Sequence, residues 1–382
     1  MGTSVAAPSG RPKRLLSIDG GGLLGLIPAE ALIEVEKQLD DITERPAPLC
    51  DRFDLIGGTS TGAILAAGLS LGLKAAQLRD FYLKFGKEIF TKCFFLTRIW
   101  HSYPSEPLVN HLKDVFGADT TLGSELLRTN VLIVTKNATQ GTTWFFNNNK
   151  KGKYYSVNSK LPLWQIVRAS TSAPTYFPPQ PITIPDAAGK PQDYEFVDGG
   201  VSTYNNPSLQ LFLEATDPAY GFGWPAGPDK LLLLSLGTGF NTVSIPPGGA
   251  AHFNVLDWAR YTIKELMGDS NLQQNILMHM IGAKPTGAIS PASAVASVPG
   301  NPNAGSLDAI SAVADKLLTY QRITIGLTRE RLDNLGLRDI DPIKVREMDA
   351  ADQILNMQRV GQAVAKEQVR MAPLKQFFAQ TL

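Results

Sequence analysis

The sequence is poor in cysteine, in histidine and in net charge. Among 382 residues there are two cysteines, Cys50 and Cys93, and four histidines, and the formal net charge at pH 7 is +1. Two cysteines are too few for a disulfide framework or a thiolate metal site, which favours a reducing compartment. A net charge close to zero offers no electrostatic basis for binding nucleic acid. We therefore expect neither a metal nor a nucleic acid partner.

Long apolar runs are also missing. A membrane-spanning helix needs about 20 apolar residues, and the longest run, 63–73, is far shorter. The amino-terminal end has no apolar core of a secretory signal, and Ala6 stands where a myristoylation signal needs Ser or Thr. We expect residues 1–12 to be a disordered tail and residues 13–382 to form a single domain. The expected location is the cytoplasm.

Apolar runs and helical patterns alternate along most of the chain. Near-continuous apolar runs at 14–18, 53–56 and 231–236 are typical of buried parallel strands. Amphipathic helical patterns at 75–90 and 106–116 follow such strands. This order predicts an α/β fold, with a largely parallel central sheet covered by helices on both faces.

The carboxyl-terminal part, from about residue 307, is predicted to be mainly helical. Apolar residues keep helical spacing over 307–322 and again over 354–364. Between them Ile323, Ile325 and Leu327 alternate, which predicts a short strand.

A serine flanked by glycines follows the second predicted strand. Gly58, Ser60 and Gly62 fit the G-x-S-x-G pattern of a nucleophile elbow. In such an elbow the serine has a strained backbone, the glycines leave room around it, and the next helix begins behind any oxyanion that forms. A turn without chemistry can share these five residues. The apolar strand before it and the apolar helix after it favour the elbow.

Three consecutive glycines end the first predicted strand. Asp19 is followed by Gly20, Gly21 and Gly22, and then by Gly25. Such a run costs backbone entropy, but it exposes N–H groups that can bind a phosphate or stabilise an oxyanion. The run lacks the lysine of a P-loop, and no acidic residue follows at the place that a dinucleotide fold requires.

An acidic residue closes a later predicted strand. Asp198 is followed by Gly199 and Gly200. A carboxylate held at the end of a rigid strand, with small neighbours, suits catalysis, although an isolated Asp-Gly-Gly is usually only a turn.

In this order the three motifs resemble those of the patatin-like phospholipases. The stretches 168–177, 205–207 and 235–239 are also similar to the family, and the resemblance covers about residues 13–240. It implies a three-layer α/β/α fold and a Ser–Asp dyad in place of a triad. Ser60 would be the nucleophile and Asp198 its base. The oxyanion hole would be formed by the N–H groups of Gly20, Gly21 and Gly22, and the supporting glycines would be Gly25, Gly58, Gly62, Gly199 and Gly200.

The resemblance implies hydrolysis of fatty-acyl esters of membrane lipids, a phospholipase A or lysophospholipase reaction through an acyl-enzyme. No metal or organic cofactor is expected. The partner would be a phospholipid or another acyl lipid, met by peripheral contact with a membrane surface. Many relatives have Arg where this chain has Leu24, which puts the local charge and the headgroup preference in question.

Other functions and another base stay open. The chain could be a lipid-binding or storage protein with little turnover, or a hydrolase that a small-molecule activator or assembly into a homo-oligomer switches on. The candidate gates are the apolar cluster 92–100 and the loop 283–306. His101 and His252 remain alternative bases. An ordinary Asp, with a pKa of about 3.9, is a weak base, so we expect burial to raise the pKa of Asp198.

Overall fold

The computed structural model describes residues 10–90, 103–186, 188–240, 245, 247–285 and 315–379. Its strands are β1 (Lys13–Ile18), β2 (Leu55–Thr59), β3 (Asn130–Asn137), β4 (Thr142–Asn147), β5 (Gln180–Pro185), β6 (Pro191–Asp198), β7 (Leu231–Leu236), β8 (Gly282–Ala283) and β9 (Leu318–Ile323). Within these residues they form one nine-stranded sheet in the order β5-β6-β3-β2-β1-β7-β9-β8, with β4 paired to β3. From β3 to β8 all neighbours along this order are parallel, and β4, β5 and β6 pair antiparallel.

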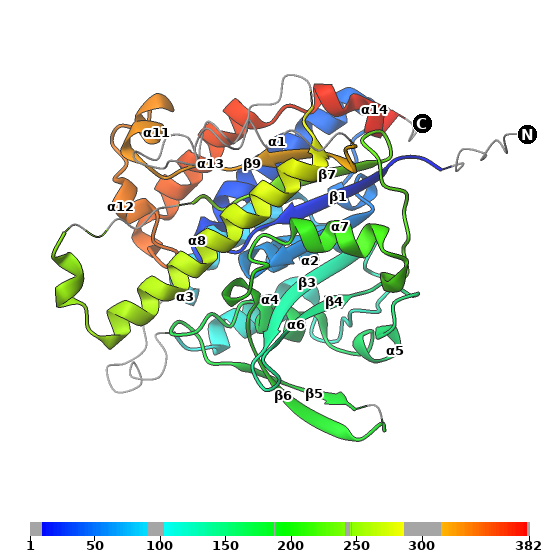
Figure 1. Cartoon of the computed structure of the whole chain (residues 1–382), viewed down its shortest axis with the longest axis horizontal. Helices are drawn as coiled ribbons and strands as arrows, with labels where there is room; N and C mark the ends of the chain where they lie inside the picture. Colours follow the sequence, from blue (N-terminus) through cyan, green and yellow to red (C-terminus); the bar gives the residue numbers. More distant parts are fainter. Residues whose placement is uncertain are drawn as a thin grey trace, which may run out of the picture.

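Helices cover both faces of this sheet. They are α1 (Leu26–Thr43), α2 (Thr61–Ser70), α3 (Ala75–Ile89), α4 (Glu106–Phe116), α5 (Tyr155–Asn158), α6 (Leu163–Ser170), α7 (Ser208–Thr216), α8 (Val255–Ile281), α11 (Arg329–Asn334), α12 (Pro342–Val345), α13 (Ile354–Gln368) and α14 (Lys375–Phe378). Side chains alternate along each strand, so Leu16 and Ile18 pack with α1, α2 and α13. Leu15 packs on the opposite face, in the core that contains α7 and Met278 of α8. Figure 1 shows α7 and α8 on the near face. The predicted α/β class is confirmed.

One secondary-structure prediction is wrong. Where residues 307–322 are described, the expected helix is replaced by strand β9, which begins at Leu318 and ends at Ile323, the first residue of the predicted strand 323–327. Strand β9 lies between β7 and β8 and all six of its residues are buried. A strand buried on both faces need not alternate between polar and apolar residues. The helical spacing of apolar residues before β9 therefore seemed to continue through the strand. Helices α11 to α14 follow only from Arg329 onward.

Some predictions fall outside the described residues. These are the apolar cluster 92–100, the loop from residue 286 to 306, and residues 1–9 of the expected tail. Within the described part of that tail, Arg11 forms an ion pair with Asp54 at 2.8 Å. No helix in the described parts of the chain is long and apolar enough to span a bilayer.

Helix α13, near the end of the chain, packs closely on α1 near its beginning. A Cβ atom at Gly361 would stand 3.0 Å from the Ile27 Cα and 3.0 Å from the Leu26 carbonyl oxygen. Because both neighbours are backbone atoms, they cannot move away easily. That α13 unfolds together with the rest of the chain, as one domain, stays a prediction.

Gly361→Val tests this prediction. The added side chain overpacks the contact between α1 and α13, and we expect a loss of about 1–3 kcal/mol of stability with a single unfolding transition. Lys366→Val, at an exposed position of the same helix, controls for the valine itself. Calorimetry that resolves a separate, early transition for the variant would contradict the single domain.

Candidate active site

Ser60 occupies a strained turn between β2 and α2. Its backbone dihedral angles are φ 54° and ψ −122°, a conformation that costs energy for any residue with a side chain. Glycine is required on both sides of Ser60 because neighbouring backbone atoms leave no room for a Cβ atom. A Cβ at Gly58 would lie 2.0 Å from the Gly62 carbonyl oxygen, and one at Gly62 would lie 2.2 Å from that of Ile18. The Ser60 N–H donates to Ser170 Oγ at 2.8 Å, which ties the turn to α6.

Asp198 lies beside Ser60, at the end of β6. The Ser60 hydroxyl donates to Asp198 Oδ2 at 2.5 Å. The Gly200 N–H donates to the other carboxylate oxygen at 2.7 Å. A Cβ at Gly199 would lie 2.5 Å from the Val134 carbonyl oxygen, so the turn after Asp198 packs directly on β3. The two residues that the sequence singled out are thus in contact.

Burial changes the proton affinity of Asp198. The residue is 4% exposed, and desolvation raises the pKa of its carboxyl group to about 6, against the opposing effects of the Ser60 and Gly200 hydrogen bonds and the Arg168 charge. Arg168 is itself buried and donates to Ser172 Oγ at 2.5 Å and Ser105 Oγ at 2.9 Å. A carboxylate with this pKa is ionised at neutral pH and can still accept a proton.

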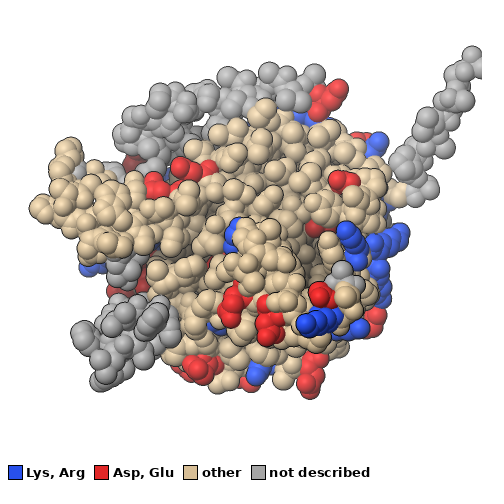
Figure 2. All heavy atoms as spheres, turned by 60° about the horizontal axis from the view of Figure 1, so that its bottom comes forward, with Lys and Arg blue, Asp and Glu red and all other residues tan. Residues whose placement is uncertain are grey.

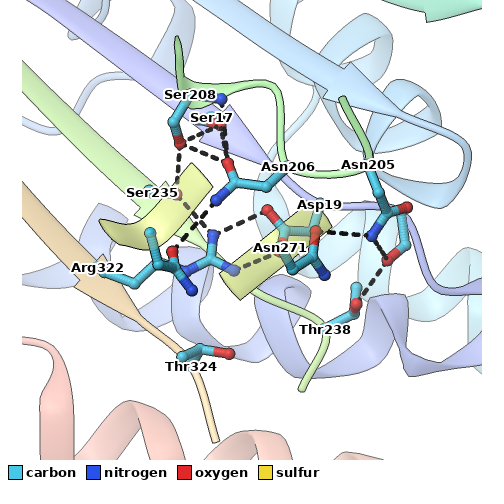
Figure 3. Close-up of polar contacts among 12 residues, drawn as sticks. Ser17, Asp19, Asn205, Asn206, Ser208, Ser235, Thr238, Asn271, Arg322 and Thr324 are labelled. Atoms are coloured by element: carbon cyan, nitrogen blue, oxygen red, sulfur yellow. Dashed lines mark hydrogen bonds and ion pairs between the residues drawn. The ribbon is translucent and has the colours of Figure 1, made fainter. Parts of the chain in front are cut away.

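The glycine loop after β1 has one fixed peptide orientation. The Gly20 carbonyl accepts from Thr238 Oγ1 at 2.6 Å and Asn205 Nδ2 at 3.4 Å (Figure 3). In a trans peptide the following N–H points the opposite way, so the Gly21 N–H points away from Thr238. Among the described residues, neither the Gly21 nor the Gly22 N–H has a hydrogen-bond acceptor. The Gly20 N–H differs, because it donates to the Asn205 carbonyl at 3.1 Å.

A buried ion pair holds the start of this loop. Arg322 of β9 donates from Nη1 to Asp19 Oδ1 at 2.8 Å and from Nη2 to Asp19 Oδ2, and Nη1 also donates to Ser235 Oγ at 2.6 Å (Figure 3). Asp19 is fully buried and Arg322 is 4% exposed. On the other side the Leu23 N–H donates to the Met348 carbonyl at 2.8 Å. Segments far along the chain therefore position the glycine loop.

Sequence reasoning missed Arg322 and Met348 altogether. A buried arginine in a central strand has no local motif, and Met348 contributes only its backbone carbonyl. The stretch 205–207 was noticed, and its role is now visible. Asn205 holds the Gly20 peptide, while Asn206 Oδ1 accepts from Ser208 Oγ at 2.6 Å, within a buried cluster of hydroxyl groups (Figure 3).

A mainly apolar pocket opens at Ser60 and Asp198, and the empty space in and over it, open solvent included, is about 840 Å³. Ser60, Asp198, Gly21 and Gly22 lie at its polar end. Its apolar lining includes Leu23, Ile64, Phe81, Tyr82, Ile89, Phe90, Leu108, Tyr176, Phe177, Ile263, Met267 and Met348. The lining suits an apolar group whose reactive end reaches Ser60.

The described histidines lie elsewhere. His111 stacks on Phe85 and binds Glu88 at 3.0 Å, and His279 contacts Tyr320. Neither these two nor His252 lines the cavity that contains Ser60, and His101 lies outside the described residues. In the same described part, no group of three or more His, Cys, Asp or Glu residues could hold a metal ion.

Two solved structures align with most of the chain. VipD from Legionella pneumophila aligns with a TM-score of 0.37 and 12% identity, over 91% of this chain and 67% of that one. The complex of SpcU with ExoU from Pseudomonas aeruginosa aligns with a TM-score of 0.32 and 14% identity, over 97% and 77%. Because both scores are below 0.5, the family assignment depends on the sequence matches.

Those matches are consistent with one another. The profile of the patatin-like phospholipases matches residues 16–212, about half of the chain. Patatin-2-Kuras 1 from Solanum tuberosum is 32% identical over 252 residues, which is 63% of this chain and 66% of the relative. Patatin-17 from Solanum cardiophyllum is 32% identical over 250 residues, 62% and 63% of the two. The matches thus span just under two thirds of these relatives. The chain belongs to the patatin-like phospholipase family.

Proposed function

We propose that the chain is a serine lipid acyl hydrolase of the phospholipase A or lysophospholipase type, which cleaves fatty-acyl esters of membrane lipids. The observation that carries this proposal is the 2.5 Å hydrogen bond from Ser60 to the buried Asp198, at the polar end of an apolar cavity. Membership of the patatin-like phospholipase family supports the substrate class. A cavity of this kind would bind the acyl chain and leave the ester at Ser60.

The proposed reaction needs no group beyond this site. Asp198 takes the proton of Ser60 as its oxygen attacks the ester carbonyl, and then gives that proton to the leaving alcohol. Water, deprotonated by Asp198, releases the fatty acid from the acyl-enzyme. We propose the Gly21 and Gly22 N–H groups as donors to the oxyanion. The Gly20 N–H, which the sequence prediction included, is already bonded to Asn205.

Two alternatives predict different outcomes for the same protein. A lipid-binding or storage protein would fill the cavity without turnover. A hydrolase gated by an activator or by oligomer formation would turn over only in the presence of that activator or at high protein concentration. The strained Ser60 favours an active nucleophile, because such strain is typical of functional sites.

The dyad is tested with mixed phospholipid vesicles and mass spectrometry of released fatty acids and lysolipids. We expect Ser60→Ala and Asp198→Asn each to lose at least about 10³-fold in rate. A fluorophosphonate should label the wild type but not Ser60→Ala. Ser124→Ala, in a remote loop, is the control.

Three results would contradict parts of the proposal. A wild type that hydrolyses no lipid at any protein concentration and is not labelled by the fluorophosphonate would indicate a binding protein. Full activity of Asp198→Asn would exclude Asp198 as the base. Labelling of Ser60→Ala would exclude Ser60 as the nucleophile.

The pH dependence follows from the raised pKa of Asp198. Only the ionised carboxylate can accept the Ser60 proton, so kcat/KM should rise with pH, bend at about 6 and then stay level. Below the bend we expect about a tenfold fall per pH unit, measured with a short-chain soluble ester. Circular dichroism at each pH controls for unfolding. A profile that is level down to pH 4 would mean that burial does not raise this pKa.

Thr238 tests the proposed oxyanion hole. Thr238→Val keeps the shape but removes the shorter of the two hydrogen bonds to the Gly20 carbonyl, so the direction of the Gly21 N–H is less firmly fixed. Complete loss of one oxyanion donor costs about 10²–10³ in kcat, and we expect a fall of about 10- to 100-fold with little change in KM. Thr238→Ser, which keeps the hydroxyl, should stay within about threefold. Equal losses in the two variants would indicate a packing role only.

A further inference from the structure

A stripe of uncharged side chains runs along the outer face of the first half of α8. It consists of Val255, Trp258, Ala259, Thr262 and Leu266, all of them exposed. Val255 is 87% exposed, Leu266 59% and Trp258 43%. Because these residues are 3, 4, 7 and 11 positions after Val255, they lie on one side of the helix. Contiguous exposed apolar surface of this kind marks interaction sites.

Aromatic rings strengthen this feature at the beginning of α8. Trp258 packs edge-on against Phe253 and Tyr261, with ring centroids 5.2 and 5.7 Å apart. Such side chains, with an apolar body and a polar tip in Trp and Tyr, suit the boundary between lipid and water. The segment that leads into α8, at the left of Figure 1, forms a projection in Figure 2 with neither blue nor red atoms at its tip.

The same helix forms part of the cavity wall. Ile263 and Met267 line the cavity that contains Ser60. A helix with its side chains is about 10 Å across, so a molecule on the outer stripe is separated from the cavity by one helix. The stripe and the pocket wall belong to the same helix. This favours a lipid surface as the occupant of the stripe, because the proposed function places an acyl chain in the pocket.

The charges around the stripe indicate the kind of lipid. Among the described side chains of this half of α8, the ionisable groups beside the stripe are Asp257, Lys264 and Glu265, and Asp269 follows its end. Lys264 forms an ion pair with Glu347 at 2.6 Å. The remaining described groups are acidic, and the sequence adds one cation, Arg260, so the charges of this half of the helix nearly balance and give no net attraction to an anionic surface. They are compatible with a zwitterionic one.

We propose that this stripe docks the protein on a zwitterionic phospholipid bilayer, with Trp258 at the level of the headgroups and the cavity wall facing the same lipids. The inference deepens the proposed function, because it names the surface at which a lipid hydrolase would collect its substrate. Binding can be measured without turnover, so the two proposals can fail separately.

The first test measures binding with Ser60→Ala, which leaves the vesicles intact. Phosphatidylcholine vesicles with acyl chains brominated near the headgroup should quench the tryptophan fluorescence, and chains brominated near the bilayer centre should quench less. Trp258→Phe in the same background should abolish most of this quenching, although Trp100, Trp144, Trp164 and Trp224 remain. Quenching that persists in Trp258→Phe, or no quenching at all, would overturn the proposal.

The second test compares two leucines of similar exposure. Leu266→Gln on α8 should weaken vesicle binding at least tenfold, equivalent to about 1.4 kcal/mol, and slow vesicle hydrolysis in proportion. Hydrolysis of a short-chain soluble ester should not change. Leu355→Gln on α13, where Leu355 is 66% exposed, should affect neither.

The remaining outcomes separate the docking surface from the catalytic proposal. Equal effects of the two leucine variants, or binding only to anionic vesicles, would overturn the docking surface. So would a concentration-dependent dimer that Leu266→Gln dissociates without changing vesicle binding, because a second copy would then occupy the stripe. If the wild type binds vesicles as expected but never hydrolyses the soluble ester, the docking surface stands and the catalytic proposal fails.

Discussion

The hydrogen bond between Ser60 and the buried carboxylate of Asp198 is the contact on which the rest of the site depends. An ionised carboxylate removed from water is unstable unless hydrogen bonds and charges offset the loss of hydration. Here the offset comes from the Ser60 hydroxyl, the Gly200 N–H and the Arg168 charge. This offset is incomplete, and the pKa of Asp198 therefore stays above that of an exposed aspartate. A fully compensated carboxylate would be a weaker base, so the same incomplete compensation that costs stability suits proton transfer.

The strain at Ser60 is maintained by packing on both sides of the turn. Glycine is required at positions 58 and 62 because backbone atoms approach too closely for any Cβ. These contacts hold the start of α2 against the end of β1, while Ser170 fixes the Ser60 N–H. A strained residue persists only when its surroundings over-determine it. The conformation of the elbow therefore depends on β1, β2, α2 and α6 together. The five residues of its motif are the only part of this arrangement that can be recognised in the sequence.

The glycine loop depends on residues beyond the part of the chain that the family profile matches. That match ends at residue 212, whereas Thr238, Arg322 and Met348 all hold the loop. Removing Arg322 would leave Asp19 as an unpaired buried charge, which is strongly destabilising. Asp19 is the first residue of the glycine motif, so its partner on β9 links the last part of the sheet to the site. The carboxyl-terminal third thus belongs to the site by its contacts, even though it carries none of the three motifs.

Local chemistry explains which features the sequence could predict. Ser60, Asp198 and the glycines lie in turns where few residue types are tolerated, so their patterns are visible without a structure. Arg322 was hidden because its partner is distant in sequence, and β9 was mistaken for helix because burial on both faces removes the alternation of a strand. The full extent of helix α8 was not predicted. Its apolar residues face two ways, with Val255 and Leu266 outward and Ile263 and Met267 toward the cavity. Two apolar directions on one helix blur the single stripe that periodicity analysis seeks. This same division of α8 is what the proposed docking surface would require of a helix between a bilayer and the apolar pocket at Ser60.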